Sequence, residues 1–457
     1  FGQPRGRGWG AFTEQVSPMR KEADVIVIGS GPGGATVARG LARAGKRVLL
    51  LERGKDWRRS QLYGTYPGAL MYADRQALLF TREGLNIIRP LMAGGATSMY
   101  CGCAAPPPAW LKDKYKIDLD KHVTGTIDEL KIAPLPPELR GTASTRLADS
   151  ANALGYNWQP LPKFMSPART QHFDCGAKCM LGCRCGAKWN AAEWADEAVS
   201  TGCCEFVTEA RVDELIVENR KVNGVRGRIK GKPFEAIAPV VVLAAGGIGS
   251  PLLLKRAGLS RAGQGIGMDT TVMVYGASRF AGNGNEPPMT YEWANDEVGY
   301  LLSTLIDPWL NYPIVMALKG PGALATWTRW NQTLGVMIKL KDDISGSVES
   351  ERSISKPFTA NDRKKLGHAS AVAKQILVKA GADPNSLLMT PLRGTHPCAT
   401  VRLGPEGVLD QDLQTEIENL YVCDASAFPE SLARPTVLTI IGLGKRLVEH
   451  LLRKTGD

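Results

Sequence analysis

The chain has 457 residues, of which 44% are hydrophobic and 22% charged, and its formal net charge is +11. A chain of this length and composition can bury a large core, and no apolar run reaches the roughly 18 residues that a membrane span requires. The basic residues form no dense run with interleaved aromatic side chains, so we expect no nucleic-acid partner. Residues 1–19 lack the apolar segment of a secretory signal, and we expect them to form an N-terminal extension of a cytoplasmic protein.

Residues 24–54 predict a buried strand, a glycine turn, an amphipathic helix and a second strand. Gly29, Gly31 and Gly34 make the pattern G-x-G-x-x-G directly after the first apolar run. Glycines at these places allow a tight turn and a close approach of the backbone, so a pyrophosphate can sit at the helix N-terminus. Glu52 closes the second apolar run, roughly 20 residues after the first glycine, where a carboxylate can hold ribose hydroxyls. The stretch predicts dinucleotide binding.

The rest of the first half predicts several further elements. The loop Gly-Gly-Ala-Thr-Ser at 94–98 is either a second place where backbone N–H groups face a phosphate or flavin edge, or a structural turn. Apolar periodicity predicts helices over 119–130, 138–154 and 191–200, and strands over 207–217 and 222–229.

The second half begins with an apolar strand over 240–250, which we expect to return to the central parallel sheet beside the first strand. Residues 289–340 are rich in aromatic side chains and short apolar runs, which favours an antiparallel sheet lining a pocket or an ordinary sheet core. A helix over 359–380, a strand over 420–429 and a final helix over 436–453 complete the pattern.

Ten cysteines are present, and four of them, Cys175, Cys179, Cys183 and Cys185, fall within eleven residues. Four thiolates on a glycine-rich loop are suited to an iron–sulfur cluster or a structural zinc ion. Their spacing matches no common ferredoxin or zinc-finger pattern, so two disulfides or free thiols stay open as alternatives. Cys101 and Cys103 are compatible with covalent flavin attachment or a redox pair, and plain packing is the favoured reading.

Five separated stretches, 29–52, 94–98, 241–251, 393–404 and 419–444, together resemble the glucose-methanol-choline (GMC) family of FAD-dependent oxidoreductases. The cysteine segment looks most like the branch of long-chain alcohol oxidases and bacterial dehydrogenases. The resemblance implies an α/β (α+β overall) fold. In it, a Rossmann-like FAD-binding domain with a parallel sheet is interleaved with a smaller substrate domain built on an antiparallel sheet.

The resemblance also implies a domain division. We expect a discontinuous FAD-binding domain over 20–105, 203–275 and 396–457, with the cysteine-bearing insertion over 106–202. The substrate domain is expected over 276–395.

The same resemblance assigns residues to the cofactor. Glu52 is expected at the adenosine ribose, Val212 near the adenine, and Asp424 at the ribityl or pyrophosphate region. The full set expected to bind FAD is Gly29, Gly31, Pro32, Gly33, Gly34, Glu52, Arg53, Gly94, Gly95, Thr97, Ser98, Val212, Ala245, Gly246, Asp424, Ala425 and Thr436.

His396 matches the family's active-site histidine, and the chemistry suits this residue type. Oxidising an alcohol requires loss of the hydroxyl proton, which a histidine can accept near neutral pH. The structural alternative is that His396 only caps a turn before Pro397. The family's second His or Asn is replaced here by Pro435, so Arg434 or Thr436 is expected to take over its polar role.

The expected reaction is oxidation of a small-molecule alcohol by an FAD-dependent dehydrogenase, with hydride transfer to the flavin. Electrons are expected to leave through a 4Fe–4S or 3Fe–4S cluster on Cys175, Cys179, Cys183 and Cys185, with zinc as the weaker alternative. The acceptor would be a protein or quinone, and any membrane association would come through such a partner. Alternatives are an oxygen-using alcohol oxidase, a flavin electron-transfer subunit and a non-oxidative flavin enzyme, as a homo-oligomer or a complex subunit.

Overall fold

Apolar runs of four residues form the centre of a parallel sheet in the computed structural model, which describes residues 18–317 and 320–454. The strand order is β23 (Leu420–Val422), β13 (Val240–Leu243), β2 (Val25–Ile28), β3 (Val48–Leu51) and β9 (Cys204–Val207). All neighbours run parallel. Every residue of β2, β3 and β13 is buried, because layers cover both faces of the sheet. The predicted return of the 240–250 strand beside the first strand is confirmed. The N-terminal extension expected over 1–19 lies almost wholly outside the described residues.

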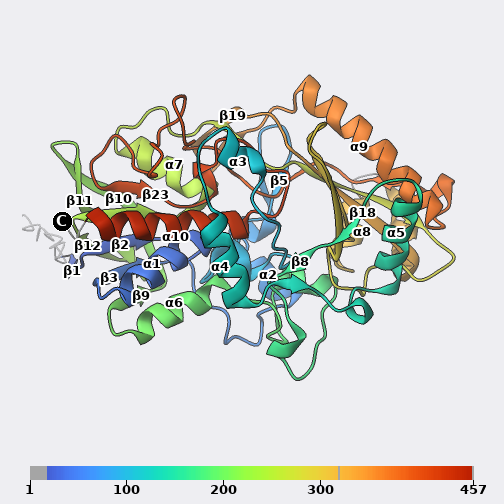
Figure 1. The fold of residues 1–457 in the computed structure, drawn as a ribbon, viewed down its shortest axis with the longest axis horizontal. Helices are drawn as coiled ribbons and strands as arrows, with labels where there is room; N and C mark the ends of the chain where they lie inside the picture. Colours follow the sequence, from blue (N-terminus) through green and yellow to red (C-terminus); the bar gives the residue numbers. More distant parts are fainter. Residues whose placement is uncertain (1–17, 318–319, 455–457) are drawn as a thin grey trace, which may run out of the picture.

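Helices cover one face of this sheet. They are α1 (Pro32–Arg43), α6 (Ala191–Ser200) and α10 (Val437–Lys454), with α4 (Asp120–Leu130) packed on α10. Figure 1 shows α10 and α1 side by side in the left half of the molecule. The helix α6 begins at Asn190, whose side chain and that of Glu193 form a capping box. Three of the helices predicted from periodicity are therefore present at nearly the expected positions.

A second sheet covers the other face. It consists of β1 (Met19–Glu22), β12 (Lys232–Ile237), β11 (Lys221–Ile229) and β10 (Ala210–Glu218). Its strands are antiparallel except for the parallel pair of β1 with β12. Val222, Val225 and Phe234 from this layer join the same apolar core as the parallel strands. The strand predicted over 240–250 is shorter than expected. It ends at Leu243, because Gly246 adopts a φ of +77° and the chain turns there into α7 (Gly246–Arg256).

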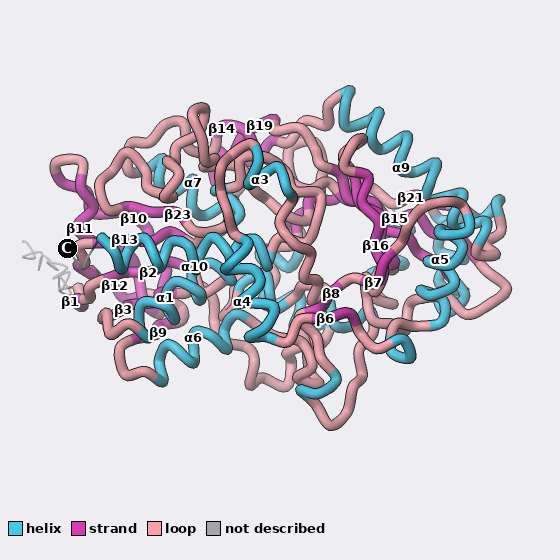
Figure 2. Tube along the Cα trace, in the orientation of Figure 1, coloured by secondary structure: helices cyan, strands magenta, loops and turns pink. Residues whose placement is uncertain are grey.

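The other half of the molecule is built on a nine-stranded sheet that is mostly antiparallel. The main path is β4 (Leu79–Phe80), β5 (Asn86–Ile87), β22 (Arg393–Gly394), β15 (Thr271–Ala277), β18 (Thr333–Leu340), β17 (Tyr300–Thr304), β16 (Tyr291–Asn295) and β7 (Gln159–Pro160), and β21 (Leu388–Met389) also pairs with β15. Figure 2 shows these strands as a second magenta group, to the right of the parallel sheet. The antiparallel sheet predicted over 289–340 is thus confirmed in β16, β17 and β18.

The outer face of this sheet packs against α5 (Thr142–Ala153) and α9 (Ala360–Lys379). The helix α5 begins later than the predicted 138–154 helix, because Gly141 has a φ of +88° and interrupts the helical backbone. The helix α9 matches its prediction and begins at the Thr359 cap, where Asp362 completes a capping box.

The inner face of the sheet is defined by strand register. Met273 lies opposite Met337, and Met337 lies opposite Ser303 on the next strand. Ser303 in turn lies opposite Glu292. Directly opposed residues of antiparallel strands point to the same face, so these side chains share one surface. Lys339 lies on this surface too, two residues along β18 from Met337.

The chain crosses between the two halves several times. The strands β4 and β5, which come early in the sequence, enter the nine-stranded sheet through the parallel pair of β5 with β22. The strand β15 also belongs to this sheet, so we place the domain division before Thr271 rather than after residue 275. Smaller elements are α2 (Tyr66–Tyr72), α3 (Ala109–Asp113), α8 (Asn311–Ala317), β6 (Ala133–Pro134), β8 (Pro162–Lys163), β14 (Gln264–Ile266), β19 (Ser345–Ser350) and β20 (Ser353–Ser355). Within the described ranges, no helix has the length and apolar character needed to cross a membrane.

Candidate active site

The glycine turn after β2 places the N-terminus of α1 at a cavity of about 520 Å³. A Cβ on Gly33 would lie 1.8 Å from the carbonyl oxygen of Cys423, and one on Gly34 would lie 1.8 Å from that of Gly29. A Cβ on Gly31 would instead meet no protein atom within 4 Å. Gly33 and Gly34 thus allow close packing of the chain, whereas Gly31 leaves its backbone open to the cavity. This division of roles fits a pyrophosphate at the helix N-terminus.

Glu52 is buried at the end of β3. Its Oε2 accepts hydrogen bonds from the backbone N–H (3.0 Å) and hydroxyl (2.7 Å) of Ser30, and its Oε1 accepts one from the Gly54 N–H (2.8 Å). Burial raises the pKa of Glu52 above its ordinary value. Glu52 lines the cavity, as the ribose role requires. Arg53 lines it as well, but its guanidinium is paired with Glu351.

Asp424 connects three elements at the cavity floor. Its Oδ2 accepts from the Gly246 N–H at 2.8 Å and from the Ser250 hydroxyl at 2.5 Å, and its Oδ1 accepts from the Ser426 N–H at 2.7 Å. Burial raises the pKa of Asp424. A Cβ on Gly246 would meet no atom within 4 Å, so the start of α7 is also open to the cavity.

Most of the residues expected at FAD do line this one cavity. They are Gly29, Gly31, Pro32, Gly33, Glu52, Arg53, Gly95, Val212, Ala245, Gly246, Asp424, Ala425 and Thr436. Backbone donors at two helix starts, two carboxylates and apolar walls together fit a long dinucleotide.

Gly34, Gly94, Thr97 and Ser98 are not among the residues that line the cavity. The Thr97 hydroxyl accepts from the Ala191 N–H at 2.9 Å, and the Ser98 hydroxyl accepts from the Asn190 amide at 2.9 Å. Both side chains therefore fix the 94–98 loop to the start of α6.

His396 lines the same cavity, and its side chain is 26% exposed there. Its Nδ1 lies 2.8 Å from Oδ2 of Asp269. Because a carboxylate can only accept, Nδ1 carries the proton and Nε2 carries a lone pair. Burial, together with the nearby charge of Lys339, lowers the pKa of His396 below its ordinary value, and Asp269 opposes this effect. His396 is therefore a neutral base near pH 7.

Asp269 was not identified from the sequence. It is fully buried just before β15, and its backbone has a φ of +44°. Its second oxygen, Oδ1, accepts from the Ala433 N–H at 2.8 Å, so one carboxylate holds both His396 and the segment before Arg434. Lys339 donates to the Thr395 hydroxyl at 2.6 Å, next to His396. One acidic residue before a strand matches no sequence motif, so Asp269 could not be recognised from the sequence. The fold brings it to His396.

Thr436 lines the cavity, but Arg434 is not among the lining residues. The Arg434 guanidinium donates through Nη2 to Asp296 at 2.6 Å, and its side chain is 13% exposed. The structure thus separates the two residues that were expected to replace the family's second polar group.

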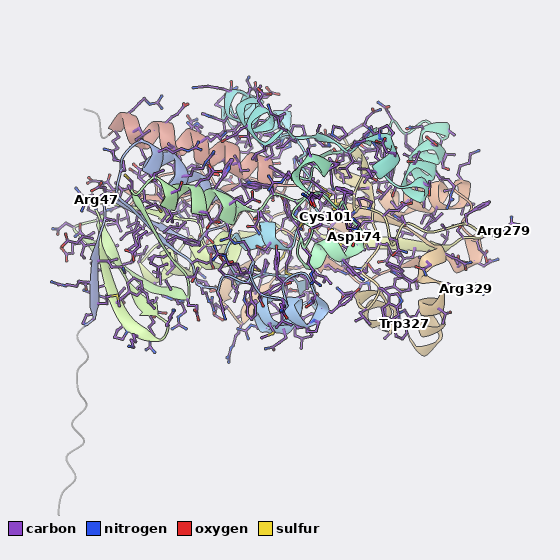
Figure 3. The ribbon with its side chains drawn as sticks, turned by 90° about the horizontal axis from the view of Figure 1, so that it is seen from below. Arg47, Cys101, Asp174, Arg279, Trp327 and Arg329 are labelled. Carbon is purple, nitrogen blue, oxygen red and sulfur yellow. The ribbon has the colours of Figure 1, made fainter. Side chains whose placement is uncertain are left out.

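The four clustered cysteines lie on a loop beside α2. The Sγ of Cys185 lies 3.7 Å from that of Cys175 and 3.8 Å from that of Cys183, and the Lys188 N–H donates to the Cys183 sulfur at 3.3 Å. Figure 3 shows Asp174, which precedes Cys175, near the middle of the molecule together with Cys101. None of the ten cysteines forms a disulfide. Among the residues that the structure describes, no group of three or more His, Cys, Asp or Glu side chains is arranged to hold a metal ion.

Cys101 and Cys103 do not line the cavity. The Lys163 ammonium donates to the Cys103 sulfur at 3.1 Å. Burial raises the pKa of Cys101 to about 12, so its thiol is protonated. These contacts agree with a packing role.

Comparison with known proteins finds three family-model matches. Residues 107–273 and 355–444 match models of GMC oxidoreductases, and residues 22–61 match an FAD binding domain. A GMC-type oxidoreductase of Mycobacterium tuberculosis (strain ATCC 25618 / H37Rv) is 26% identical over 96% of this chain and 77% of its own length. The long-chain-alcohol oxidase FAO4B of Arabidopsis thaliana is 25% identical over 95% of this chain and 68% of its own.

A solved structure is also similar. Pyridoxine 4-oxidase from Mesorbium loti superposes with a TM-score of 0.71 over 94% of this chain and 99% of its own, at 16% identity. At this identity the likeness shows the fold alone, and it confirms the expected combination of an FAD-binding domain with an antiparallel substrate domain.

Proposed function

The chain belongs to the GMC oxidoreductase family, and from this premise we propose that it oxidises an alcohol with His396 as the base that takes the hydroxyl proton. As a member of this family it is an FAD-dependent oxidoreductase that acts on CH–OH groups. Bound FAD supplies the hydride acceptor. The observation that carries the proposal is a cavity-lining histidine whose Nδ1 is held by Asp269, so that Nε2 carries the lone pair.

The proton chemistry follows from the contacts of His396. Its lowered pKa keeps the imidazole neutral and able to accept a proton at Nε2. Once Nε2 is protonated, the ring carries a positive charge, and the Asp269 carboxylate at Nδ1 stabilises that charge. The Lys339 ammonium acts in the opposite direction and favours return of the neutral ring.

We propose that the cavity residues hold FAD along its length. Gly31 and Gly246 would present helix N-termini to its phosphates, and Glu52 would accept from ribose hydroxyls. Val212 would cover the adenine, and Thr436 would contact the flavin end near His396. These roles are supported by the presence of all these residues in the lining of one cavity.

The test is anaerobic reduction of bound flavin by alcohols in wild type and in a His396→Ala variant. Removal of a general base should slow the reduction by about 10²- to 10⁴-fold. FAD content, measured from the visible spectrum, should stay unchanged in the variant. A variant that keeps full FAD and the wild-type reduction rate would refute the role of His396.

We also propose that electrons leave the flavin through an iron–sulfur cluster whose ligands are the four clustered cysteines. The proposal is supported by the presence of four cysteines on one loop, where the Cys185 sulfur lies 3.7 Å from that of Cys175 and 3.8 Å from that of Cys183. Purified protein should then contain iron and acid-labile sulfide and absorb beyond the flavin bands. Cys179→Ser should remove this absorbance, whereas Cys203→Ser, outside the loop, should retain it. Iron-free protein that passes electrons to a quinone at full rate would exclude the cluster.

Direct use of oxygen is the second candidate for the oxidative half of the cycle. The long-chain-alcohol oxidase among the relatives favours it. Mixing the reduced protein with oxygen separates the two proposals: fast reoxidation by oxygen supports an oxidase, and slow reoxidation with fast transfer to a quinone supports a dehydrogenase.

A further inference from the structure

Asp342 is buried just after the end of β18 and accepts hydrogen bonds from two separate segments of the chain. Its Oδ2 accepts from the Thr270 N–H at 3.1 Å and from the Thr270 hydroxyl at 2.6 Å. Both of its oxygens lie within reach of the Met268 N–H, at 3.1 and 3.2 Å. Its Oδ1 also accepts from the Ser431 hydroxyl. All of these partners donate, which suits an ionised carboxylate.

Lys356 supplies the counter-charge of Asp342. Its ammonium lies 3.5 Å from Oδ2 of Asp342, and both side chains are 0% exposed. The ammonium also donates to the carbonyl oxygens of Ile266, at 2.9 Å, and of Asp343. Burial raises the pKa of Asp342, and the charge of Lys356 opposes this effect. Lys356 therefore favours the ionised form of Asp342.

The first segment that Asp342 holds is the turn that carries Asp269. Met268 and Thr270, whose N–H groups donate to Asp342, are the two neighbours of Asp269. Asp269 has a φ of +44°, a left-handed conformation that is costly for residues other than glycine and persists only where the surroundings fix it. The Met268 carbonyl also accepts from the His396 N–H at 2.9 Å. Asp342 thus holds the turn that contacts both the side chain and the backbone of His396.

The second segment that Asp342 holds is also a partner of Asp269. Ser431 donates to Asp342, and two residues later the Ala433 N–H donates to Asp269 at 2.8 Å. Ala433 has a φ of +56°, again a left-handed conformation. Asp342 and Asp269 are therefore joined through both segments, and only Asp269 contacts the imidazole of His396.

We propose that Asp342 is a positioning residue for the base, because it holds the Asp269 carboxylate in the place from which that carboxylate fixes Nδ1 of His396. Asp342 is not among the residues that line the cavity, so its role is exerted through Asp269. The inference rests on the proposed function, because it concerns the same base. The competing role for Asp342 is general stabilisation of the fold.

The experiment measures anaerobic flavin reduction by an alcohol, at a pH at which the rate of each variant has levelled off. Under this condition the effect of the Asp342 charge on the pKa of His396 does not enter the rate. Asp342→Ala should slow the reduction by about a hundredfold, the effect of a misplacement of about 1 Å at the reacting groups. The matched control is Asp343→Ala. The Asp343 carboxylate contacts Thr359 and Asn361 at the start of α9, so this variant should keep the wild-type rate.

A double variant separates positioning from general stabilisation. If Asp342 acts through Asp269, a protein that already carries Asp269→Asn has little more to lose. Asp269→Asn with Asp342→Ala should then be less than about tenfold slower than Asp269→Asn alone. A further loss of about tenfold or more, or a wild-type rate in Asp342→Ala, would overturn the positioning role.

A milder variant keeps the test open should Asp342→Ala not fold. Ser431→Ala removes one donor to Asp342 and leaves the buried ion pair with Lys356 in place. Flavin reduction should be about tenfold slower in Ser431→Ala, the effect of one lost hydrogen bond to a charged group, with little further loss when Asp269→Asn is already present. A wild-type rate in Ser431→Ala would overturn the proposal.

Failure of the proposed function gives a different result. In that case no alcohol reduces the flavin of wild type, and the ring proton of His396 is observed directly, by nuclear magnetic resonance of protein with isotope-labelled histidine. The chain has five histidines, and His396→Ala identifies the signal of His396. Wild type and Asp343→Ala should carry the proton on Nδ1, whereas Asp342→Ala should show a mixture of both tautomers. The wild-type tautomer alone in Asp342→Ala would overturn the inference.

Discussion

At the scale of single residues, the behaviour of His396 depends on what surrounds its ring. Asp269 fixes the proton on Nδ1, burial and Lys339 lower the pKa of the ring, and the residue lines the cavity. An isolated histidine of the same sequence context would have neither a defined tautomer nor a lowered pKa. The base is thus a property of three side chains from three separate segments.

Replacing Asp269 with Asn tests the fixed tautomer. An amide can donate to Nδ1, which moves the ring proton to Nε2 and removes the lone pair from the cavity. We expect flavin reduction to slow by about a hundredfold or more. The pH dependence of the flavin-reduction rate is the informative measurement, because a purely structural effect of the substitution would lower this rate equally at every pH. Unchanged rates in a folded Asp269→Asn protein with full FAD would contradict the prediction.

The charge of Lys339 should be visible in the pH dependence. A positive charge near His396 disfavours the imidazolium and so lowers its pKa, and the groups facing the ring are Lys339, Asp269 and Asp342. Activity that needs the neutral base should rise with pH through this pKa and then level off. Lys339→Met should raise the pKa of His396, so the rise in flavin-reduction rate should move to higher pH. A shift to lower pH, or none, would show that the lysine charge does not reach the ring.

At the scale of elements, the turn between β2 and α1 separates packing from binding. Gly33 faces the backbone of Cys423, whereas Gly31 faces only the cavity. The two positions are two residues apart in the same turn, yet each is constrained by a different contact. Gly33 is constrained by its contact with the backbone that follows β23, a strand far away in sequence. Gly31 is constrained by the ligand that would occupy the cavity.

Two alanine variants separate these roles. Gly31 has a φ of −64°, which alanine tolerates, so Gly31→Ala should keep the unfolding temperature of FAD-free protein and weaken FAD binding. In Gly33→Ala the new Cβ would lie 1.8 Å from a backbone oxygen, so the chain must shift and stability should fall by about 1–3 kcal/mol or more. Thermal unfolding of the FAD-free proteins and titration with FAD measure the two effects. Equal destabilisation by both variants would contradict this assignment.

At the scale of the whole molecule, sequence patterns predicted helices and strands better than they predicted contacts between distant residues. Runs such as 25–28 and 48–51 are apolar throughout because both sheet faces are covered, and this pattern is local. The glycine turn, Glu52 and His396 also stood within recognisable stretches. Asp269 did not, because its importance arises from a contact with His396, which the fold brings to the start of β15 from a segment that is distant in sequence. The hydrogen bonds of Thr97 and Ser98 to the start of α6 likewise join segments that are distant in sequence, so the sequence did not predict them.

We expect the contacts between the two halves to make the unfolding of the molecule cooperative, and a substitution of Arg393 tests this expectation. Arg393 lies on β22, next to β5 in the nine-stranded sheet and three residues before His396, and both of its terminal nitrogens donate to the buried Asp307, at 2.6 and 2.7 Å. Arg393→Met would leave the buried Asp307 without its two guanidinium donors, at a cost of about 3–5 kcal/mol. Because β4, β5 and β22 connect the sheet to the cavity wall, FAD release and loss of the antiparallel sheet should occur in one transition, at a lower temperature than in wild type.

Flavin fluorescence and circular dichroism, followed during the same thermal unfolding, measure this transition. The control is Arg402→Met, at a partly exposed position. Two separated transitions in the variant would show that the halves unfold independently.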